Sequence, residues 1–291
     1  MRLKDLTVTS FKNYEHLSLD FQDFRFVGFT GPNGVGKTNL LDAIHYLSLG
    51  KSYFNPSDRQ HIQAGGQFFN VKGTFEQNDK SHEVFCSYMP GRKKVIKQNG
   101  APYDKLTDHI GQFPNVIITP YDVKLINEGS EERRRFLDSI ISQIDKTYLQ
   151  QISQYQRYLS QRNARLKEMA EGGYFDASLI DVYDETLGPL ADAIYQRRKA
   201  FIEAFNPVFS RYYAWLSQGQ ESVALSYDSP LHEASLAVLL KQNLEKDRAL
   251  QRTTTGIHRD DLDFTIFNYS LKRFGSQGQQ KSYLIALKLA Q

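Results

Sequence analysis

The segment GFTGPNGVGKTNLLDAIHYLSLG, residues 28–50, contains a glycine-rich loop followed by an apolar run with helical spacing. The loop matches the pattern G-x-x-x-x-G-K-[ST] at every fixed position. Glycines permit positive φ and close backbone approach, so successive N–H groups can point inward toward an anion. We therefore predict a phosphate-binding loop in which Lys37 reaches the β- and γ-phosphates of a nucleoside triphosphate and the Thr38 hydroxyl binds Mg²⁺. Its residues are Gly31, Pro32, Asn33, Gly34, Val35, Gly36, Lys37 and Thr38.

The sequence on both sides of the loop has the order that such a loop requires. Residues 24–29, FRFVGF, are apolar and rich in β-forming residues, which predicts a strand. The residues after the loop predict a helix whose positive dipole end faces the same anion. Its apolar stripe is Leu40, Leu41, Ile44, Leu47 and Leu49. This order predicts nucleoside triphosphate binding, but it does not distinguish an ATPase, a GTPase and a small-molecule kinase.

The composition is that of an ordinary globular protein. The chain has 291 residues, of which 24% are charged and 40% hydrophobic, enough for a large core and two lobes. A net charge of +3 does not by itself indicate a nucleic-acid partner. Cys86 is the only cysteine, which fits a reducing cytoplasm. No apolar run is long enough to span a membrane and the N-terminus is unlike a signal peptide, so we expect a cytoplasmic protein without a membrane partner.

Residues 1–125 are predicted to form the N-terminal part of an ATPase lobe. Beyond the P-loop, the turn signals Pro90-Gly91 and Asn99-Gly100 predict a hairpin. We predict a mixed β-sheet around the P-loop strand, and hence an α/β fold. Strands are predicted by β-rich runs at residues 3–11, 16–21, 68–76, 82–89 and 93–100.

Residues 126–250 are predicted to form an inserted helical lobe. Residues 143–169 contain no Gly or Pro and predict a long helix. A second helical tract, residues 179–216, is expected to be interrupted at Gly188-Pro189 and at Pro207. A third helix is predicted at 231–250, and residues 251–291 are predicted to return to the ATPase lobe. The apolar stripes of the two long tracts include Ile144, Tyr148, Ile152, Tyr155, Leu159 and Leu166, and then Val182, Leu190, Ile194, Phe201 and Phe205.

Basic residues occur in three runs. The first is 133–135, the second is 197–199, and the third comprises Lys93, Lys94 and Lys97. The simplest interpretation of each run is a solvated face. A DNA-binding surface would instead require them to lie on one side of the fold.

A second small-residue turn precedes a helix near the end of the sequence. In RFGSQGQQKSYLIALKLAQ, residues 273–291, Ser276 and Gly278 precede an apolar stripe. A serine hydroxyl, glycine N–H groups and a helix N-terminus again make an anion site. The Ser-x-Gly-Gln pattern, which ends at Gln279, looks like the signature motif of ABC-type ATPases. In such proteins the motif faces the γ-phosphate held by a second subunit, so that ATP links the two subunits of a dimer.

With both motifs in view, the chain closely resembles the RecF family, bacterial recombination-repair ATPases of the SMC-like ABC group. The resemblance implies a P-loop ABC-type ATPase lobe plus a helical lobe. It also implies ATP, Mg²⁺, an ATP-dependent homodimer, and DNA as duplex or as junctions of single and double strands. The implied role is recombinational repair of gaps and stalled forks with RecO and RecR. The matching residues are FKNY (11–14), GPNGVGKTNLLDAI (31–44), VIITPYDVKLINEGSEERRRFLD (116–138), GIHRDDLDF (256–264) and GSQGQQK (275–281).

The resemblance also assigns roles to individual residues. It places Lys12 and Asn13 near the nucleotide, and it makes the residues of the Ser276 motif act on the nucleotide of a second subunit. Asp122 falls in the region that corresponds to a Q-loop, where it is a candidate for Mg²⁺ or water; a helix cap is the alternative. His258 is expected to have a structural hydrogen-bonding role rather than a catalytic one.

One element of the family pattern is missing from the sequence. Hydrolysis in such ATPases requires a Walker B strand with an Asp for Mg²⁺ and an acid that activates water. HRDDLDF, residues 258–264, has acids but no preceding apolar run. We therefore expect a chain that stops short of Walker B and hydrolyses ATP very poorly. Two rival functions, a transporter ATPase subunit and a small-molecule kinase, fit the polar helical arm, the FKNY segment and the Ser276 motif less well.

Overall fold

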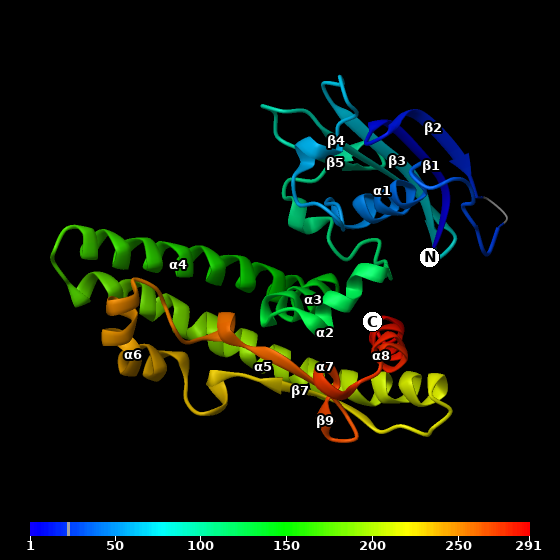
Figure 1. Cartoon of the computed structure of the whole chain (residues 1–291). Helices are drawn as coiled ribbons and strands as arrows, with labels where there is room; N and C mark the ends of the chain where they lie inside the picture. Colours follow the sequence, from blue (N-terminus) through cyan, green and yellow to red (C-terminus); the bar gives the residue numbers. More distant parts are fainter. Residues whose placement is uncertain (22–23) are drawn as a thin grey trace. The chain divides into compact units, whose positions relative to one another are not determined.

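The computed structural model describes residues 1–21 and 24–291 (Figure 1). The chain divides into two compact units, Met1–Ile117 and Ile118–Gln291, and each contains its own apolar core. The predicted segment boundary near residue 125 stays a prediction, as does the one near residue 250. In the structure, residues 126–291 lie within a single compact unit.

The first unit is a six-stranded sheet with one helix, α1 (Lys37–Leu49). The order is β2-β1-β3-β4-β5-β6, and every described pairing is antiparallel. The strands match the five predicted runs, and the Asn99-Gly100 turn, with positive φ at both residues, joins β5 to β6. The strands are β1 (Arg2–Phe11), β2 (Tyr14–Asp20), β3 (Phe69–Gln77), β4 (Lys80–Tyr88), β5 (Val95–Gln98) and β6 (Ala101–Pro102).

Helix α1 packs closely on this sheet. Its buried stripe includes Ala43 and Leu47, which lie in one core cluster with Val71 of β3 and Val84 of β4. A Cβ at Gly73 of β3 would lie 2.8 Å from Leu47 Cδ1, so the absence of a side chain there lets the helix approach the strand. The predicted stripe is confirmed at Leu40, Leu47 and Leu49, whereas Leu41 is exposed.

The strand predicted at residues 24–29 is not formed. These residues have no regular secondary structure, and Phe26 is 86% exposed. A strand needs neighbouring N–H and C=O groups to complete its hydrogen bonds. Within the described part of the chain, no strand pairs with this segment. The local β propensity of FRFVGF was therefore a misleading guide.

The second unit consists of helices and a three-stranded antiparallel sheet of order β7-β8-β9. The helix predicted at 143–169 corresponds to α4, and EGGYFD ends it as expected. The helices are α2 (Lys124–Asn127), α3 (Ser130–Ile144), α4 (Lys146–Glu171), α5 (Ala177–Leu216), α6 (Leu236–Leu250), α7 (Leu271–Phe274) and α8 (Gln277–Leu289). The strands are β7 (Val223–Asp228), β8 (Asp261–Ile266) and β9 (Tyr269–Ser270).

Helix α5 runs through both predicted interruptions. It continues for 40 residues and contains Pro189 and Pro207. Both prolines are exposed, so the carbonyl groups that lose a helical N–H partner lie on the solvent side. The opposite face is buried against α4, α6, α8 and β7, which stabilises the helix beyond its local propensity (Figure 1). Two predicted stripe residues, Val182 and Ile144 of α3, are exposed instead.

Two buried arginines hold the helical unit together. Arg198 of α5 is paired with Asp138 of α3 at 2.8 Å and with Asp260 at 2.5 Å. Arg162 of α4 is paired with Asp184 of α5 and with Asp247 of α6. Because a buried charge is strongly destabilising without a partner, these pairs fix the packing of the helices. The solvated-face interpretation of the run 197–199 is therefore wrong for Arg198.

Candidate nucleotide-binding site

The predicted P-loop has the backbone that an anion cradle requires. Gly31, Gly34 and Gly36 have φ of 146°, 83° and 105°, values that favour glycine. The loop is solvent-exposed at residues 31–35, and α1 begins at Lys37 as predicted. The loop thus leads directly into the N-terminus of a helix that is packed on a sheet. Phosphate groups are favoured at such a position by N–H groups and by the helix dipole.

The Lys37 ammonium lies over its own loop. Its Nζ donates to the carbonyl oxygens of Gly31 and Pro32, both at 2.8 Å. The Thr38 side chain is exposed and makes no hydrogen bond to another described residue. A cation at the loop and an available hydroxyl beside it fit a Mg²⁺-bound triphosphate. Among the described residues, no group of three or more His, Cys, Asp or Glu side chains is placed to hold a metal ion alone.

Asn13 lies directly against the P-loop. Its Nδ2 donates to Val35 O at 2.9 Å, and its Oδ1 accepts from Asn39 Nδ2 at 2.7 Å. A Cβ at Gly36 would lie 2.5 Å from Asn13 Nδ2 and 2.8 Å from the Tyr14 hydroxyl. The FKNY segment is therefore a wall of the loop. Asn39 and Tyr14 belong to the same contact, although no role was predicted for either of them.

Lys12 is held by a buried carboxylate that the sequence analysis missed. Lys12 Nζ donates to Asp42 Oδ2 at 2.5 Å, and Asp42 on α1 is fully buried. Asp42 also accepts from Ser52 Oγ at 2.6 Å and from Tyr53 N at 2.8 Å. This carboxylate joins the β1–β2 turn, the P-loop helix α1, and the loop after that helix. The available signal was an Asp within the otherwise apolar stripe of α1.

The Ser276 motif begins helix α8, in the second unit. The Ser276 hydroxyl accepts from Gln279 N at 3.2 Å, and the Gln279 side chain accepts from Ser276 N at 2.8 Å, which is a capping box. Gln279 Nε2 also donates to Glu221 at 2.7 Å. Ser276 and Gly278 are exposed. The motif is therefore an accessible helix N-terminus, as the anion-site prediction requires, while Gln279 is committed to holding the turn.

Asp122 has the capping role that was its alternative assignment. Its carboxylate accepts from Thr119 N at 2.5 Å at the start of the 120–123 turn. Lys288, near the end of α8, pairs with it at 3.3 Å, and both side chains are buried. Burial lowers the pKa of Lys288. The assignment of Asp122 as a Mg²⁺ ligand stays a prediction.

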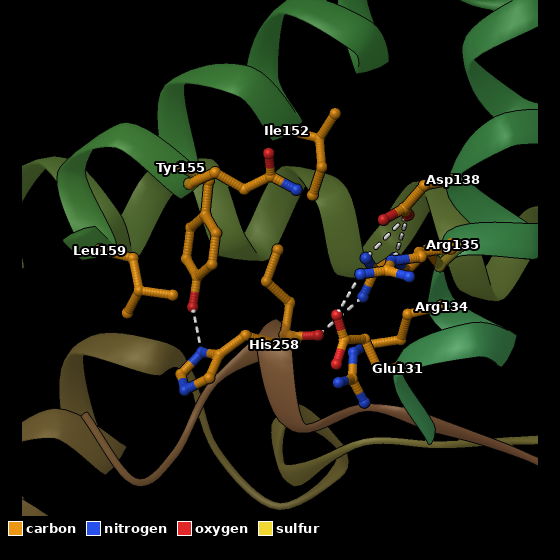
Figure 2. A pocket seen from close by; sticks show the side chains of 11 residues that line it. Glu131, Arg134, Arg135, Asp138, Ile152, Tyr155, Leu159 and His258 are labelled. Carbon is orange, nitrogen blue, oxygen red and sulfur yellow. Dashed lines mark hydrogen bonds and ion pairs between the residues drawn. The ribbon is translucent and has the colours of Figure 1, made fainter. Parts of the chain in front are cut away.

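His258 is part of the packing of the helical unit. Its Nδ1 lies 2.9 Å from the Tyr155 hydroxyl and its Nε2 lies 3.2 Å from Thr253 O. Burial lowers the pKa of His258 to about 4. His258 thus makes structural hydrogen bonds of the kind that were expected. Figure 2 shows His258 and Tyr155 pointing toward one another in a pocket of about 140 Å³, which also includes Arg134 and Glu131 in its lining.

Comparisons with known proteins identify the family. Residues 5–255 match a family described as an AAA domain. The DNA replication and repair protein RecF of Flavobacterium johnsoniae is 50% identical over 291 residues, which cover 100% of this chain and 81% of that protein. The chain belongs to the RecF family.

Solved structures agree with this membership of the RecF family. A structure of the recombination mediator protein RecF with ATP in the RecFOR pathway has a TM-score of 0.90 at 30% identity, covering 99% of this chain and 79% of that one. The RecF protein of Parabacteroides distasonis is 45% identical over all of this chain and 78% of its own length. An Smc head bound to a domain of ScpA has a TM-score of 0.53 at 17% identity, which shows a shared fold. The predicted class, a P-loop ABC-type ATPase lobe with a helical lobe, is confirmed.

Both candidate phosphate sites of this RecF-family chain have thus been located, one in each compact unit. The P-loop residues and Asn13 form one continuous site. Lys12 is next to Asn13 in sequence, and its ammonium pairs with the buried Asp42 carboxylate of α1. Ser276 and Gly278 form a separate helix N-terminus. In the described part of the chain, no helix has both the length and the apolar character needed to cross a membrane.

Proposed function

We propose that the chain binds ATP at the P-loop and acts in the cytoplasm as an ATP-dependent DNA-binding protein of recombinational repair. The observation that carries the proposal is the P-loop itself, an exposed run of positive-φ glycines that ends at a helix N-terminus with Lys37 across it. The ATP-bound RecF relative supports the choice of ATP over other triphosphates. Mg²⁺ would be bound by the Thr38 hydroxyl together with phosphate oxygens, and would neutralise their charge.

The second part of the proposal is an ATP-dependent homodimer. Ser276 and Gly278 are exposed at the start of a 13-residue helix, where an anion is favoured. They would contact the γ-phosphate held by the P-loop of a second copy, and Gln279 would fix their turn. The dimer would hold duplex DNA or a junction through its phosphates and would cooperate with RecO and RecR, as the RecFOR assignment of the relatives suggests.

Light scattering after size-exclusion chromatography tests the P-loop part. With ATP and Mg²⁺ the wild-type chain is expected to elute as a dimer, and without them as a monomer. Lys37→Ala should remain monomeric with ATP, because the cation that reaches the phosphates is gone. Lys80→Ala, which removes an exposed lysine at the start of β4, should dimerise like the wild type. Dimerisation of Lys37→Ala at wild-type ATP concentration would contradict the proposal.

The Ser276 part has its own test. Ser276→Asp keeps a residue that caps helices as well as serine does, but it places a negative charge where the γ-phosphate would lie. This variant should bind ATP with wild-type affinity and fail to dimerise. Ser276→Asn, a neutral cap, should retain more dimer. ATP-driven dimerisation of Ser276→Asp equal to that of the wild type would show that the motif does not face a nucleotide.

A further inference from the structure

The three basic runs differ in how their charges are compensated. In the second unit, Arg133 makes a bidentate pair with Asp261, at 2.6 and 2.9 Å. Arg135 pairs with Glu131 and Glu132, and Arg197 pairs with Asp145. These runs are largely neutralised within the protein. They therefore offer little positive field to an external partner.

The run of Lys93, Lys94 and Lys97 in the first unit is different. Its one ion pair between described residues joins Lys94 to Asp58 and links two loops that are rich in basic residues. Lys94 Nζ donates to Gly50 O at 2.7 Å and to Asp58 Oδ2 at 2.8 Å. Both side chains are mostly buried. The pair holds the loop after α1, residues 50–62, against the β4–β5 loop, residues 89–94. It also uses the one acidic side chain that the loop after α1 contains.

Exposed cations lie next to the residues of this internal contact in the sequence. Residues 50–62 and 88–98 contain six Lys and Arg residues and a single acid, Asp58. Lys94 contacts Gly50 and Asp58, so the sequence neighbours of these three residues are brought to one region. These neighbours include four cations, Lys51, Arg59, Lys93 and, one residue further on, Arg92. Arg59, Arg92 and Lys93 have no acidic partner among the described residues. We define this basic surface as Lys51, Arg59, Arg92 and Lys93, all of which are exposed.

We propose that the basic surface of Lys51, Arg59, Arg92 and Lys93 binds the phosphate backbone of DNA. The proposal rests on the proposed function and assigns its DNA contact to particular residues. Duplex DNA carries one negative charge per roughly 1.7 Å of its axis, so it is complemented by exposed cations such as Arg59, Arg92 and Lys93, which have no acidic partner among the described residues. An acidic protein is less suited, because stable protein interfaces have an apolar or aromatic centre. Within the fully described residues 50–62 and 88–98, the one large hydrophobic residue that is exposed is Val95, at the start of β5.

The surface lies away from the nucleotide site of the same unit. The P-loop is at the N-terminus of α1, whereas Gly50 follows its C-terminus. A 13-residue helix is about 20 Å long. DNA on the basic surface would therefore leave the P-loop open to ATP. The negative C-terminal end of the α1 dipole would also stabilise the positive charge of the basic surface.

The experiment compares two double variants with equal loss of charge. Arg92→Gln/Lys93→Gln removes two cations from the basic surface. Arg2→Gln/Lys80→Gln removes one Arg and one Lys that are exposed at the other end of the sheet, because Lys80 begins the nine-residue strand β4 whose end precedes the surface. Binding of a fluorescent 30-base-pair duplex is measured with ATP and Mg²⁺ at several salt concentrations, and thermal melting checks that each variant is folded.

The readout is the slope of log Kd against log salt concentration. The surface variant should lose about 2 from the magnitude of that slope, close to 0.9 for each phosphate contact removed, and the control should keep the wild-type slope. Arg59→Gln alone should reduce it by about 1. Equal slopes for the two double variants would overturn the inference while leaving the proposed function intact. If the wild-type chain with ATP binds no duplex at low salt, both are overturned.

Discussion

At the scale of single residues, Gly36 is the position where the P-loop has least room. A Cβ there would meet both side-chain atoms of the Asn13 amide at about 2.6 Å or less, and the backbone has φ of 105°. Gly36→Ala combines a left-handed conformation, which costs roughly 1–2 kcal/mol, with displacement of Asn13. We expect ATP affinity, measured by calorimetric titration, to fall about tenfold or more.

Gly129→Ala is the matched control for that change. A Cβ at Gly129 meets nothing within 4 Å, and its φ of −74° suits alanine. This variant should bind ATP as the wild type does. Wild-type affinity for ATP in Gly36→Ala would mean that Asn13 and Tyr14 can move away from the added methyl group at little cost. The contact between Asn13 and the loop would then not be important for ATP binding.

His258 should make stability depend on pH. Burial holds its pKa at about 4, below the unfolded value of about 6.5, so the unfolded chain binds more protons between these pH values. The contribution of neutral His258 is therefore complete above pH 6.5 and is lost as pH falls toward 4. Between pH 7 and pH 5 the loss should be about 2 kcal/mol.

Urea unfolding of the wild type and of His258→Gln at pH 7 and pH 5 measures this contribution. Glutamine does not titrate, so the difference in unfolding free energy between the two proteins should shrink by about 2 kcal/mol at pH 5. His61 and His109, whose pKa values are also lowered by burial, are present in both proteins and cancel. A difference that is constant with pH would show that His258 titrates normally.

The residue-scale contacts that could be predicted were those fixed by a local pattern. The P-loop pattern determines its own backbone, so Gly31 has the predicted positive φ and α1 begins at Lys37 as expected, while the roles of Lys37 and Thr38 toward ATP and Mg²⁺ stay predictions. Asp42 and Lys288 were not found, because their partners are 30 and 166 residues away in sequence. Such pairs depend on how α1 and α8 pack, which no local spacing encodes.

At the scale of elements, helix α1 is fastened to its surroundings through Asp42. The Lys12–Asp42 pair is buried, so removing one charge leaves the other without compensation. We expect Asp42→Asn to lower the free energy of unfolding by roughly 2–4 kcal/mol. The double variant Lys12→Gln/Asp42→Asn should be less destabilised than the sum of the single variants, because no buried charge remains.

Chemical denaturation of the four proteins completes the cycle, with Lys72→Gln and Glu83→Gln as a matched exposed pair. That pair, at 2.7 Å but about half exposed, should have a coupling energy within about 1 kcal/mol of zero. Additive effects of Lys12 and Asp42 would contradict a buried ion pair that positions the FKNY segment.

Elements were predictable where local propensity and tertiary packing agree. The strands of the first sheet alternate in polarity and pair with neighbours in sequence, so β1, β3 and β4 were predicted almost to their ends. Residues 24–29 have similar propensity but no neighbouring strand among the described residues, and they form none. Helix α5 shows the opposite case, since burial along one face overrides two prolines.

At the scale of the whole molecule, the chain has two separate sources of stability. One apolar cluster contains buried residues of α1 and the first sheet, and another contains those of α3, α5 and α8. The sequence predicted a helical lobe after an ATPase lobe, because the spacing of apolar residues changes from strand-like to helical. The sequence did not predict which apolar residues belong to which of the two clusters, because an apolar stripe does not identify the surface against which it packs.

Differential scanning calorimetry should therefore detect two unfolding transitions. In Ser276→Asp, which binds ATP but stays monomeric in our proposal, ATP with Mg²⁺ contacts only residues of the first unit, so it should raise the midpoint of that unit's transition and leave the other unchanged. At a ligand concentration of 100 times Kd, the stabilisation is about 2.7 kcal/mol. Asp42→Asn, a change in the first unit, should lower the same transition that ATP raises, which assigns it. In Lys37→Ala the ATP effect should vanish although both transitions remain. A single transition that shifts as a whole with ATP would show instead that the two cores unfold as one cooperative unit.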